Sequence, residues 1–457
     1  MPEASTAVDS AAIRWRYWLL AGGFVLLLAG GLYLPREQFG WLLCWQVGLY
    51  ILLGLLYKWR QQWSMKNIVI MALVARVVAA FIPPQLSDDV YRFIWDGQLV
   101  VHGYNPLLST PDGLLPALQT DTTFFTELHG LINHPQNYTC YPPLMQGICW
   151  LVAQLCGPHI VSNIIGIKLI IALVDSVAVV VLIKILRRLQ LPATLAILYA
   201  FNPAVIIEGS GNAHFEVIQV CLIAAAIYYA LQEKFWLAAG WWGLAIVTKL
   251  LPLLLLPLWI KKLGWKKGLL FSFISMTLAA LSFLPFVSVD FLTGFGKSLN
   301  LYFQNFEFNA SLYYIARQIG WWIKGYNYIS FIGPLLMGIF LALYAYLFFS
   351  KQKQDWQGFS KMAIIVLTLY YLLATTVHPW YIINLLPFAL MAGLRYPLIW
   401  CGVAFLSYHA YGAHGFAENP WLVAVEYGVV LVVALFEWRE LRIDNGELRV
   451  ESGELKV

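Results

Sequence analysis

The chain has 457 residues, of which 60% are hydrophobic and 12% are charged, with a mean hydropathy of +0.70. Soluble domains carry about 25% charged residues, so this composition excludes an ordinary soluble protein and predicts an integral membrane protein. The net charge of +5 fits cytoplasmic anchoring by Lys and Arg, and we do not interpret it as nucleic-acid binding. The six cysteines form no disulfide framework.

Apolar runs follow one another along most of the chain, and about 20 apolar residues suffice for one membrane span. Segment 236–260 is long enough for a span, but Lys249 and Pro252 interrupt its middle. The sequence therefore predicts an all-α integral membrane protein, a bundle of about 12–14 transmembrane helices. The other candidate spans are 16–34, 41–57, 67–83, 163–187, 192–207, 214–231, 268–288, 328–349, 361–377, 381–394, 397–412 and 421–437.

Basic residues decide how segment 236–260 crosses the membrane, because Lys and Arg accumulate on the cytoplasmic side. With Arg14 and Arg16 inside, a single span would place the cluster "KKLGWKK" (261–267) outside. A hairpin of two short helices bent near Lys249 returns the cluster to the cytoplasm. We therefore expect a broken hairpin.

This topology brings the polar segments to the external face. Segment 143–157 becomes a helix on the outer surface, within the long loop 84–162. Ionisable groups in or near a bilayer are costly and usually functional. The external face is therefore where we expect the active site. The other segments on it are 208–216, 289–327 and 375–381.

The stretch "QLSDDVYRFIWDG" (85–97) places Asp88 and Asp89 directly after an apolar segment. One interpretation is a helix start, with Ser87 as the cap and acids in the first turn. The other is a carboxylate at the membrane surface that acts as a general base. Both can hold together.

The stretch "EGSGNAHFE" (208–216) ends another span in a glycine-rich turn that holds Glu208, Asn212 and His214. Glycines permit a tight backbone and the close approach of a ligand. A turn with a single histidine is a poor set of metal ligands, so we expect no metal and no cofactor, although carboxylates could hold a divalent ion. The alternative is a plain polar reverse turn.

Lys249 lies inside the apolar stretch "TKLLPLLLLP" (248–257). It could snorkel to an interface, pair with a structural carboxylate such as Glu208, or bind a phosphate at the bend of the hairpin. In "HPWY" (378–381), an interfacial aromatic belt explains Trp380 and Tyr381 but leaves His378 unexplained.

Some enzyme classes are excluded by what the sequence lacks. It has no Walker motif, no dinucleotide fingerprint and no GxSxG elbow. Nucleotide-activated donors occur in the cytoplasm, whereas the polar loops are expected outside. An external transferase therefore needs a donor that a lipid carries.

The motifs "LSDDVYRFIWDG…GYNP", "YPPL", "NPAVIIEGSGNAHFE", "KLLPLLLLP" and "HPWY" occur in this order. They resemble the polytopic GT-C glycosyltransferases, particularly the bacterial mannosyltransferase-like branch that uses polyprenyl-phosphate sugars. The resemblance covers residues 67–395 of a membrane domain at 1–438, and we expect 439–457 to be a disordered cytoplasmic tail. Two N-terminal spans, 16–34 and 41–57, precede the region of resemblance, and we expect no soluble C-terminal domain of the kind that many relatives carry.

The resemblance implies an inverting transfer of a sugar from a polyprenyl-phosphate carrier to a hydroxyl of a glycan or glycolipid. Mannose is the favoured sugar. It places the reaction at the outer face of a bacterial cell membrane. Asp89 is the favoured base and Asp88 its neighbour, while Lys249, Arg92 and His378 are candidate cations for the leaving phosphate. For substrate binding, the resemblance implicates Glu208, Asn212, His214, His378 and Tyr381, and we add Arg92, Tyr141 and Lys249 as further substrate-binding candidates.

Two alternatives remain open from the residues. A lipid-linked sugar flippase or transporter would also have many spans, a broken helix and intramembrane charge. However, no internal repeat is visible, and the polar groups crowd one face instead of the midplane. A polymerase or ligase of lipid-linked oligosaccharide would use the same chemistry on a larger donor.

Overall fold

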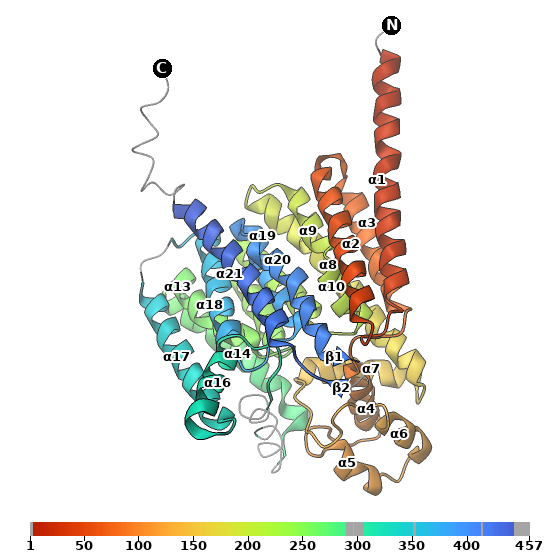
Figure 1. The fold of residues 1–457 in the computed structure, drawn as a ribbon, viewed down its shortest axis with the longest axis vertical. Coiled ribbons are helices and arrows are strands. Elements are labelled where there is room, and N and C mark those ends of the chain that lie inside the picture. The colour runs from red at the N-terminus through yellow and green to blue at the C-terminus, as the bar shows by residue number, and fades with distance from the viewer. Residues whose placement is uncertain (1–2, 289–295, 297–305, 351–352, 413–414, 443–457) are drawn as a thin grey trace.

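Apolar runs become helices throughout the computed structural model, which describes residues 3–288, 296, 306–350, 353–412 and 415–442. Figure 1 shows a bundle of helices, with the termini at one end and the helices α4 (Asp89–Val101), α5 (Pro111–Leu114) and α6 (Thr122–His129) at the other. The prediction of an all-α membrane protein is confirmed. The tail from 443 and much of the loop 289–327 lie outside the described residues.

Six helices of the described part are long and apolar enough to cross a membrane, or seven if one bent pair is a single span. The bent pair joins Ala193–Ala200 to Pro203–Gly211 at an angle of 56°. Together with the shorter apolar helices, these spans make the chain a multi-pass membrane protein. The six are α2 (Phe39–Lys58), α8 (Ile160–Arg188), α14 (Trp265–Ser282, with the turn up to Phe286), α17 (Ile329–Phe349), α18 (Trp356–Leu373) and α21 (Pro420–Arg442).

The expected count of about 12–14 spans is higher than six or seven, because several predicted spans are short or broken helices. Proline lacks an amide hydrogen and interrupts the helical ladder, as at Pro203 and Pro387. The shorter helices include α3 (Met65–Ala80), α7 (Pro143–Cys156), α11 (Glu216–Leu231), α19 (Leu386–Ala392) and α20 (Tyr396–Val403), while α1 (Glu3–Gly31) has 29 residues and is described in full from Tyr17.

Segment 236–260 is broken as predicted. It forms α12 (Phe235–Ile246), the 3-10 turn η5 (Leu251–Leu255) and α13 (Leu256–Leu263). The Phe235 and Phe271 rings lie 6.1 Å apart. Further along both helices, Ser275 donates a hydrogen bond of 2.9 Å to the Ala239 carbonyl. Helices α12 and α14 therefore run parallel, so the chain between them must turn back.

This geometry predicts that positions 234 and 264 face the same side of the membrane. Cysteines placed there, in a chain whose six native cysteines are replaced, should be labelled by an impermeant reagent from one side only. Labelling of 234 and 264 from opposite sides would show a single span. A cysteine at exposed Gln62, in the α2–α3 connection that the sequence predicts to be cytoplasmic, serves as the reference.

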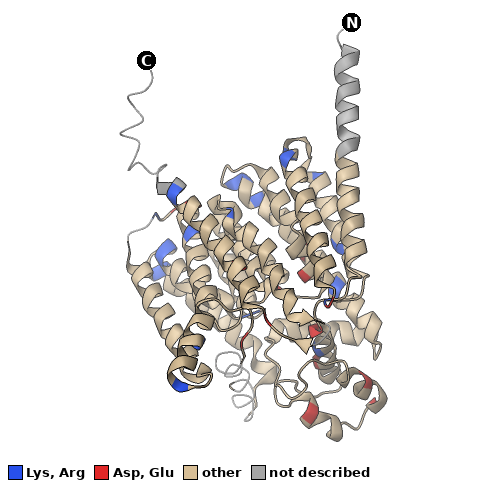
Figure 2. Ribbon diagram, viewed as in Figure 1, with Lys and Arg blue, Asp and Glu red and all other residues tan. Residues whose placement is uncertain are grey.

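Charge is segregated along the bundle. Figure 2 shows most Lys and Arg at the end where the termini lie, and most Asp and Glu at the end of α4–α6. At the basic end, Lys261 donates hydrogen bonds to the carbonyls of Phe348 (2.7 Å) and Ser350 (2.6 Å). Lysine commonly satisfies the last carbonyls of a helix in this way.

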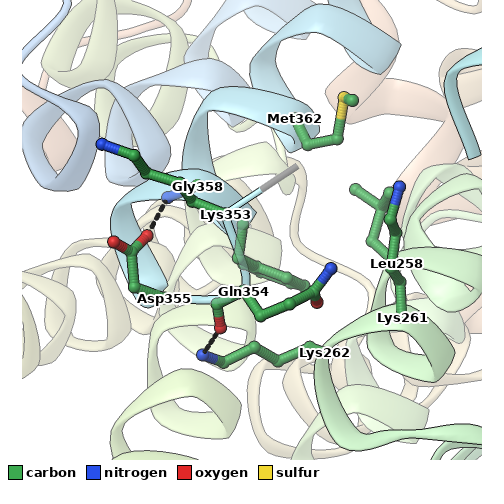
Figure 3. A pocket seen from close by; sticks show the side chains of 9 residues that line it. Leu258, Lys261, Lys262, Lys353, Gln354, Asp355, Gly358 and Met362 are labelled. Carbon is green, nitrogen blue, oxygen red and sulfur yellow. Dashed lines mark hydrogen bonds between the residues drawn. The ribbon is translucent and has the colours of Figure 1, made fainter. Parts of the chain in front are cut away.

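Figure 3 shows the small pocket beside Lys261, where the Lys262 ammonium donates to the Gln354 carbonyl and Asp355 accepts from the Gly358 amide. None of the residues that line this pocket is a candidate site residue. The ammonium groups of Lys261 and Lys262, both in α13, donate to backbone carbonyls. We therefore interpret the pocket as part of a structural contact between α13 and the segment that follows α17.

Candidate active site

The two aspartates stand at the start of α4, where the sequence predicts a helix start. The Asp89 amide donates to the Ser87 hydroxyl (3.3 Å), so Ser87 supports the first turn. Asp88 precedes the helix, and its side chain makes no capping hydrogen bond. Instead its carboxylate lies 2.8 Å from Nη2 of Arg36. The neighbouring acids therefore have different environments.

Arg36 joins three separate segments. It lies in the turn between α1 and α2, pairs with Asp88, and stacks its guanidinium 4.9 Å from the centre of the Tyr411 ring. Tyr411 belongs to β1 (Tyr411–Gly412), which pairs antiparallel with β2 (Gly415–Phe416). Nothing in the sequence alone gives Arg36 a role.

We expect Arg36→Gln and Asp88→Asn to lower turnover by similar, moderate amounts, because either change breaks the same ion pair. The double variant should then be no worse than either single variant, since residues that act through one contact are not additive. Steady-state kinetics of the wild type and the three variants measure this coupling. Additive losses would contradict the assignment.

Asp89 faces His214, which follows the π-helical turn η4 (Ile207–Gly211). Nε2 of His214 lies 3.8 Å from Oδ2 of Asp89 and 3.2 Å from the Ser87 hydroxyl. On the other edge of the ring, Nδ1 lies 3.1 Å from Oε2 of Glu208. Tyr408, in η8 (Ala404–Ala410), donates to Oε1 of Glu208 (2.8 Å). These contacts connect Asp89 to the interior.

The backbone aims His214 at this position. Ala213 adopts a left-handed conformation with φ of 67°, which is uncommon for a residue other than glycine. The His214 amide donates to the Glu208 carbonyl (2.9 Å). Gly209 is also required, since a Cβ there would lie 2.9 Å from a Val217 methyl. The glycine-rich turn thus allows close packing under the imidazole.

The charges of Asp89 and His214 depend on their burial. Burial raises the pKa of Asp89, while His214 and Lys249 oppose the rise. Burial also lowers the pKa of His214 to about 4, against the attraction of Asp89. A carboxyl group with a raised pKa beside a neutral imidazole suits general-base chemistry.

"HPWY" joins this cluster, as the sequence predicts. His214 stacks on Trp380 with ring centres 3.7 Å apart, and Trp380 stacks on His378 at 4.3 Å. His378 in turn stacks on Phe308 at 4.7 Å. We call these four rings the aromatic column. Tyr381 stands nearly perpendicular to His378, at 85°.

Lys249 lies at the bend between α12 and η5, beside Tyr381, with its Nζ 5.1 Å from the ring centre. Its ammonium donates to the carboxylate of Glu216, the first residue of α11. Glu216 is fully buried, whereas the Lys249 side chain is 25% exposed. The structural partner of Lys249 is therefore Glu216. The sequence suggests Glu208 as this partner, and that suggestion is wrong.

Asn212 supports the aspartate loop. Its side-chain oxygen accepts from the Leu86 amide (3.2 Å), and its amide donates to the Ile207 carbonyl (3.0 Å). Tyr141 packs against Phe93 of α4, edge to face, at 4.8 Å. These residues border the site.

The sequence suggests Arg92 as a cation for the leaving phosphate, but its environment differs from the one that this role requires. It is 8% exposed, pairs with Asp96 (2.9 Å) and donates to the Asn137 carbonyl (2.9 Å). Asp96 also accepts from Thr139 (2.6 Å) and Gln146 (2.9 Å). Arg92 therefore ties the segment at Asn137 to α4, and its role toward phosphate stays a prediction.

Sequence reasoning missed several parts of the site. Glu216 and Trp380 belong to motifs that it quoted, but it gave Glu216 no separate role and explained Trp380 by an aromatic belt. Tyr408 lies in an apolar run, where nothing distinguishes it from a core residue. Among the residues that the structure describes, no group of three or more His, Cys, Asp or Glu side chains could hold a metal ion.

Residues 17–263 match the family model described as "alpha-(1->6)-mannopyranosyltransferase, N-terminal domain". The match covers more than half of the chain. It contains the aspartate pair, Glu208, His214 and Lys249, and it ends before the "HPWY" segment. No curated protein and no solved structure matches the chain.

Proposed function

Since the chain belongs to the alpha-(1→6)-mannopyranosyltransferase family, we propose that it transfers mannose from a polyprenyl phosphate to a hydroxyl of a glycan or glycolipid, with inversion. Family membership makes the protein a mannosyltransferase with a sugar donor and an acceptor. The observation that carries the finer proposal is Asp89. Its side chain is 34% exposed at the edge of a buried polar cluster, so it can meet an acceptor.

In the proposed reaction, the Asp89 carboxylate takes the proton of the acceptor hydroxyl as that oxygen attacks the anomeric carbon. The new carbon–oxygen bond forms on the face opposite the phosphate, and the bond from the anomeric carbon to the phosphate oxygen breaks. The leaving phosphate keeps that electron pair. Positioning supplies much of the acceleration because phosphate is already a good leaving group.

Lys249 and His378 are the preferred groups for the phosphate. Both lie beside Tyr381, and Lys249 is partly exposed. Nδ1 of His378 is buried and has no hydrogen-bond partner among the described residues. A donor at a developing negative charge lowers the barrier most when it is already in place.

The orientation follows from charge. The basic residues gather at the end of the bundle opposite α4–α6 (Figure 2), and Lys and Arg favour the cytoplasmic side. Asp89 then faces the exterior, where a bacterial cell membrane offers lipid-linked sugars but no nucleotide sugars.

A donor screen with the purified protein tests this function. Polyprenyl-phosphate mannose, polyprenyl-phosphate glucose and GDP-mannose are each offered with a mannoside acceptor. We expect a new α-(1→6) bond with the first donor, and an α product from a β-linked donor demonstrates inversion. Exclusive use of GDP-mannose would overturn the lipid donor. Lipid translocation without a glycosidic product would indicate a transporter, and transfer only from a lipid-linked oligosaccharide would indicate a polymerase or ligase.

A further inference from the structure

The break between α12 and η5 leaves main-chain carbonyls without their usual helical partners. In a continuous α-helix the Leu253 amide would donate to the Lys249 carbonyl, but here it donates to the Leu250 carbonyl (3.0 Å). Pro252 has no amide hydrogen to offer to the Thr248 carbonyl. A buried carbonyl without a partner is costly, so this bend needs hydrogen-bond donors from other elements.

Gln219 of α11 supplies two of these donors. Its side-chain amide donates to the Ala245 carbonyl (3.1 Å), near the end of α12, and to the Lys249 carbonyl (2.6 Å), beyond the helix. Gln219 is fully buried, and its side-chain oxygen has no hydrogen-bond partner among the described residues. An unpartnered buried acceptor lowers stability. The side chain is therefore best explained by the two bonds that it donates across the break.

Helix α11 holds Lys249 at two points. Glu216 and Gln219 are three residues apart, so they lie on the same face of α11. Glu216 accepts a hydrogen bond from the Lys249 ammonium, while Gln219 donates to the Lys249 carbonyl. The side chain and the main chain of this lysine are therefore both fixed by one helix.

The motif "YPPL" contacts the same bend. Leu144 lies in the first turn of α7, where amides have no helical partner, and its amide donates to the Val247 carbonyl (3.2 Å) at the end of α12. Tyr141 of this motif packs against Phe93 of α4. The bend is thus joined to the helix that begins with Asp89.

We propose that Gln219 is a positioning residue for the donor phosphate. It fixes the bend so that the Lys249 ammonium stays beside Tyr381 and Glu216, where the lysine is partly exposed and a phosphate can reach it. A cation that is already in place stabilises the leaving phosphate without reordering the chain. This role rests on the proposed function, because it requires that Lys249 binds the donor.

The test variant is Gln219→Met, which keeps the length of the side chain and removes both donors. We expect donor KM to rise roughly 3- to 10-fold, the scale of a lost hydrogen bond, while acceptor KM stays unchanged. Gln219→Asn keeps the amide on a shorter arm, so its effect should be smaller, and it provides the measurement if Gln219→Met does not fold. An unchanged donor KM in the variant that folds, or an equal rise in both KM values, would overturn the role.

A positioning residue acts through the group that it positions. The background Lys249→Met/Glu216→Gln removes the ammonium together with its buried partner charge, and so leaves no lone charge inside the protein. Adding Gln219→Met to this background should raise donor KM no further, since residues that act through one contact are not additive. A further rise as large as that in the wild type would overturn the proposal, because Gln219 would then affect the donor without Lys249.

Gln46→Met is the matched control. Gln46 is a buried glutamine of α2, and its side chain has no hydrogen-bond partner among the residues that the structure describes. The change therefore removes a buried amide without touching the bend, and donor KM should stay unchanged. A rise equal to that in Gln219→Met would assign the effect to the loss of any buried amide and overturn the positioning role.

Hydrogen exchange measured by mass spectrometry reports the bend in the absence of a donor. We expect faster exchange of the amides in segment 244–255 in Gln219→Met, but not in Gln46→Met. An unchanged rate in Gln219→Met would contradict its hold on the bend. A wild type that uses no polyprenyl-phosphate sugar in the donor screen would instead contradict the proposed function, whatever the exchange result.

Discussion

Asp89→Asn should leave a folded protein that has lost about 10²- to 10⁴-fold in turnover. An amide and a carboxylate have nearly the same shape, but only the carboxylate accepts the proton of the attacking hydroxyl. The change should not disturb the helix start, because the Asp89 contact there is its backbone amide on Ser87. Single-turnover mannosyl transfer, with the melting temperature on the same preparation, measures both expectations.

Asp88→Asn is the control for this prediction. Asp88 pairs with Arg36, so its loss should loosen the contact between the α1–α2 turn and the start of α4 and lower turnover less. An Asp89→Asn enzyme as fast as the wild type would remove Asp89 from the mechanism. A greater loss in Asp88→Asn than in Asp89→Asn would move the base to Asp88.

The same assignment gives a pH dependence. A general base works only when ionised, so activity should rise with pH through the pKa of Asp89 and fall as the pH drops below it. Because burial raises that pKa, the loss should begin at higher pH than for an exposed aspartate. An acid limb that remains in Asp89→Asn would belong to another group.

The sequence predicts the parts of the site that are local. The double aspartate, the glycine-rich turn, Lys249 and "HPWY" are each recognisable within a few residues, because unusual polar groups stand out in apolar runs. The reversal near Lys249 was also predictable, since the basic cluster at 261–267 disfavours a single span. The aspartate loop and the "HPWY" segment indeed lie together in the fold.

The pairings between distant segments were not predictable. Tyr408 and Glu208 are 200 residues apart, and nothing in "LSYHAYG" marks a tyrosine that will meet a carboxylate. Arg36 is a single arginine in a short turn, and its contact with Asp88 depends on how α1 and α2 pack. The predicted count of about 12–14 refers to apolar segments, and the described residues divide these between six or seven helices long enough to span alone and several shorter apolar helices.

Lys249→Met should have the second large effect, on stability and on donor binding together. It removes the ammonium that neutralises Glu216, which is fully buried. Breaking a buried ion pair costs about 3–5 kcal/mol, and we expect the low end because Lys249 is 25% exposed. If the ammonium also binds the donor phosphate, donor KM should rise while acceptor KM stays unchanged.

The variant Lys249→Met/Glu216→Gln separates these two roles. It removes both charges of the pair, and replacing a whole buried pair is often neutral, so the melting temperature should return toward that of the wild type. Donor KM should stay raised, because glutamine cannot supply the cation that a phosphate needs. Recovery of both melting temperature and donor KM in the double variant would make Lys249 a structural partner of Glu216 alone. His378, which lies next to Tyr381 and has a buried Nδ1, would then be the remaining candidate to bind the leaving phosphate.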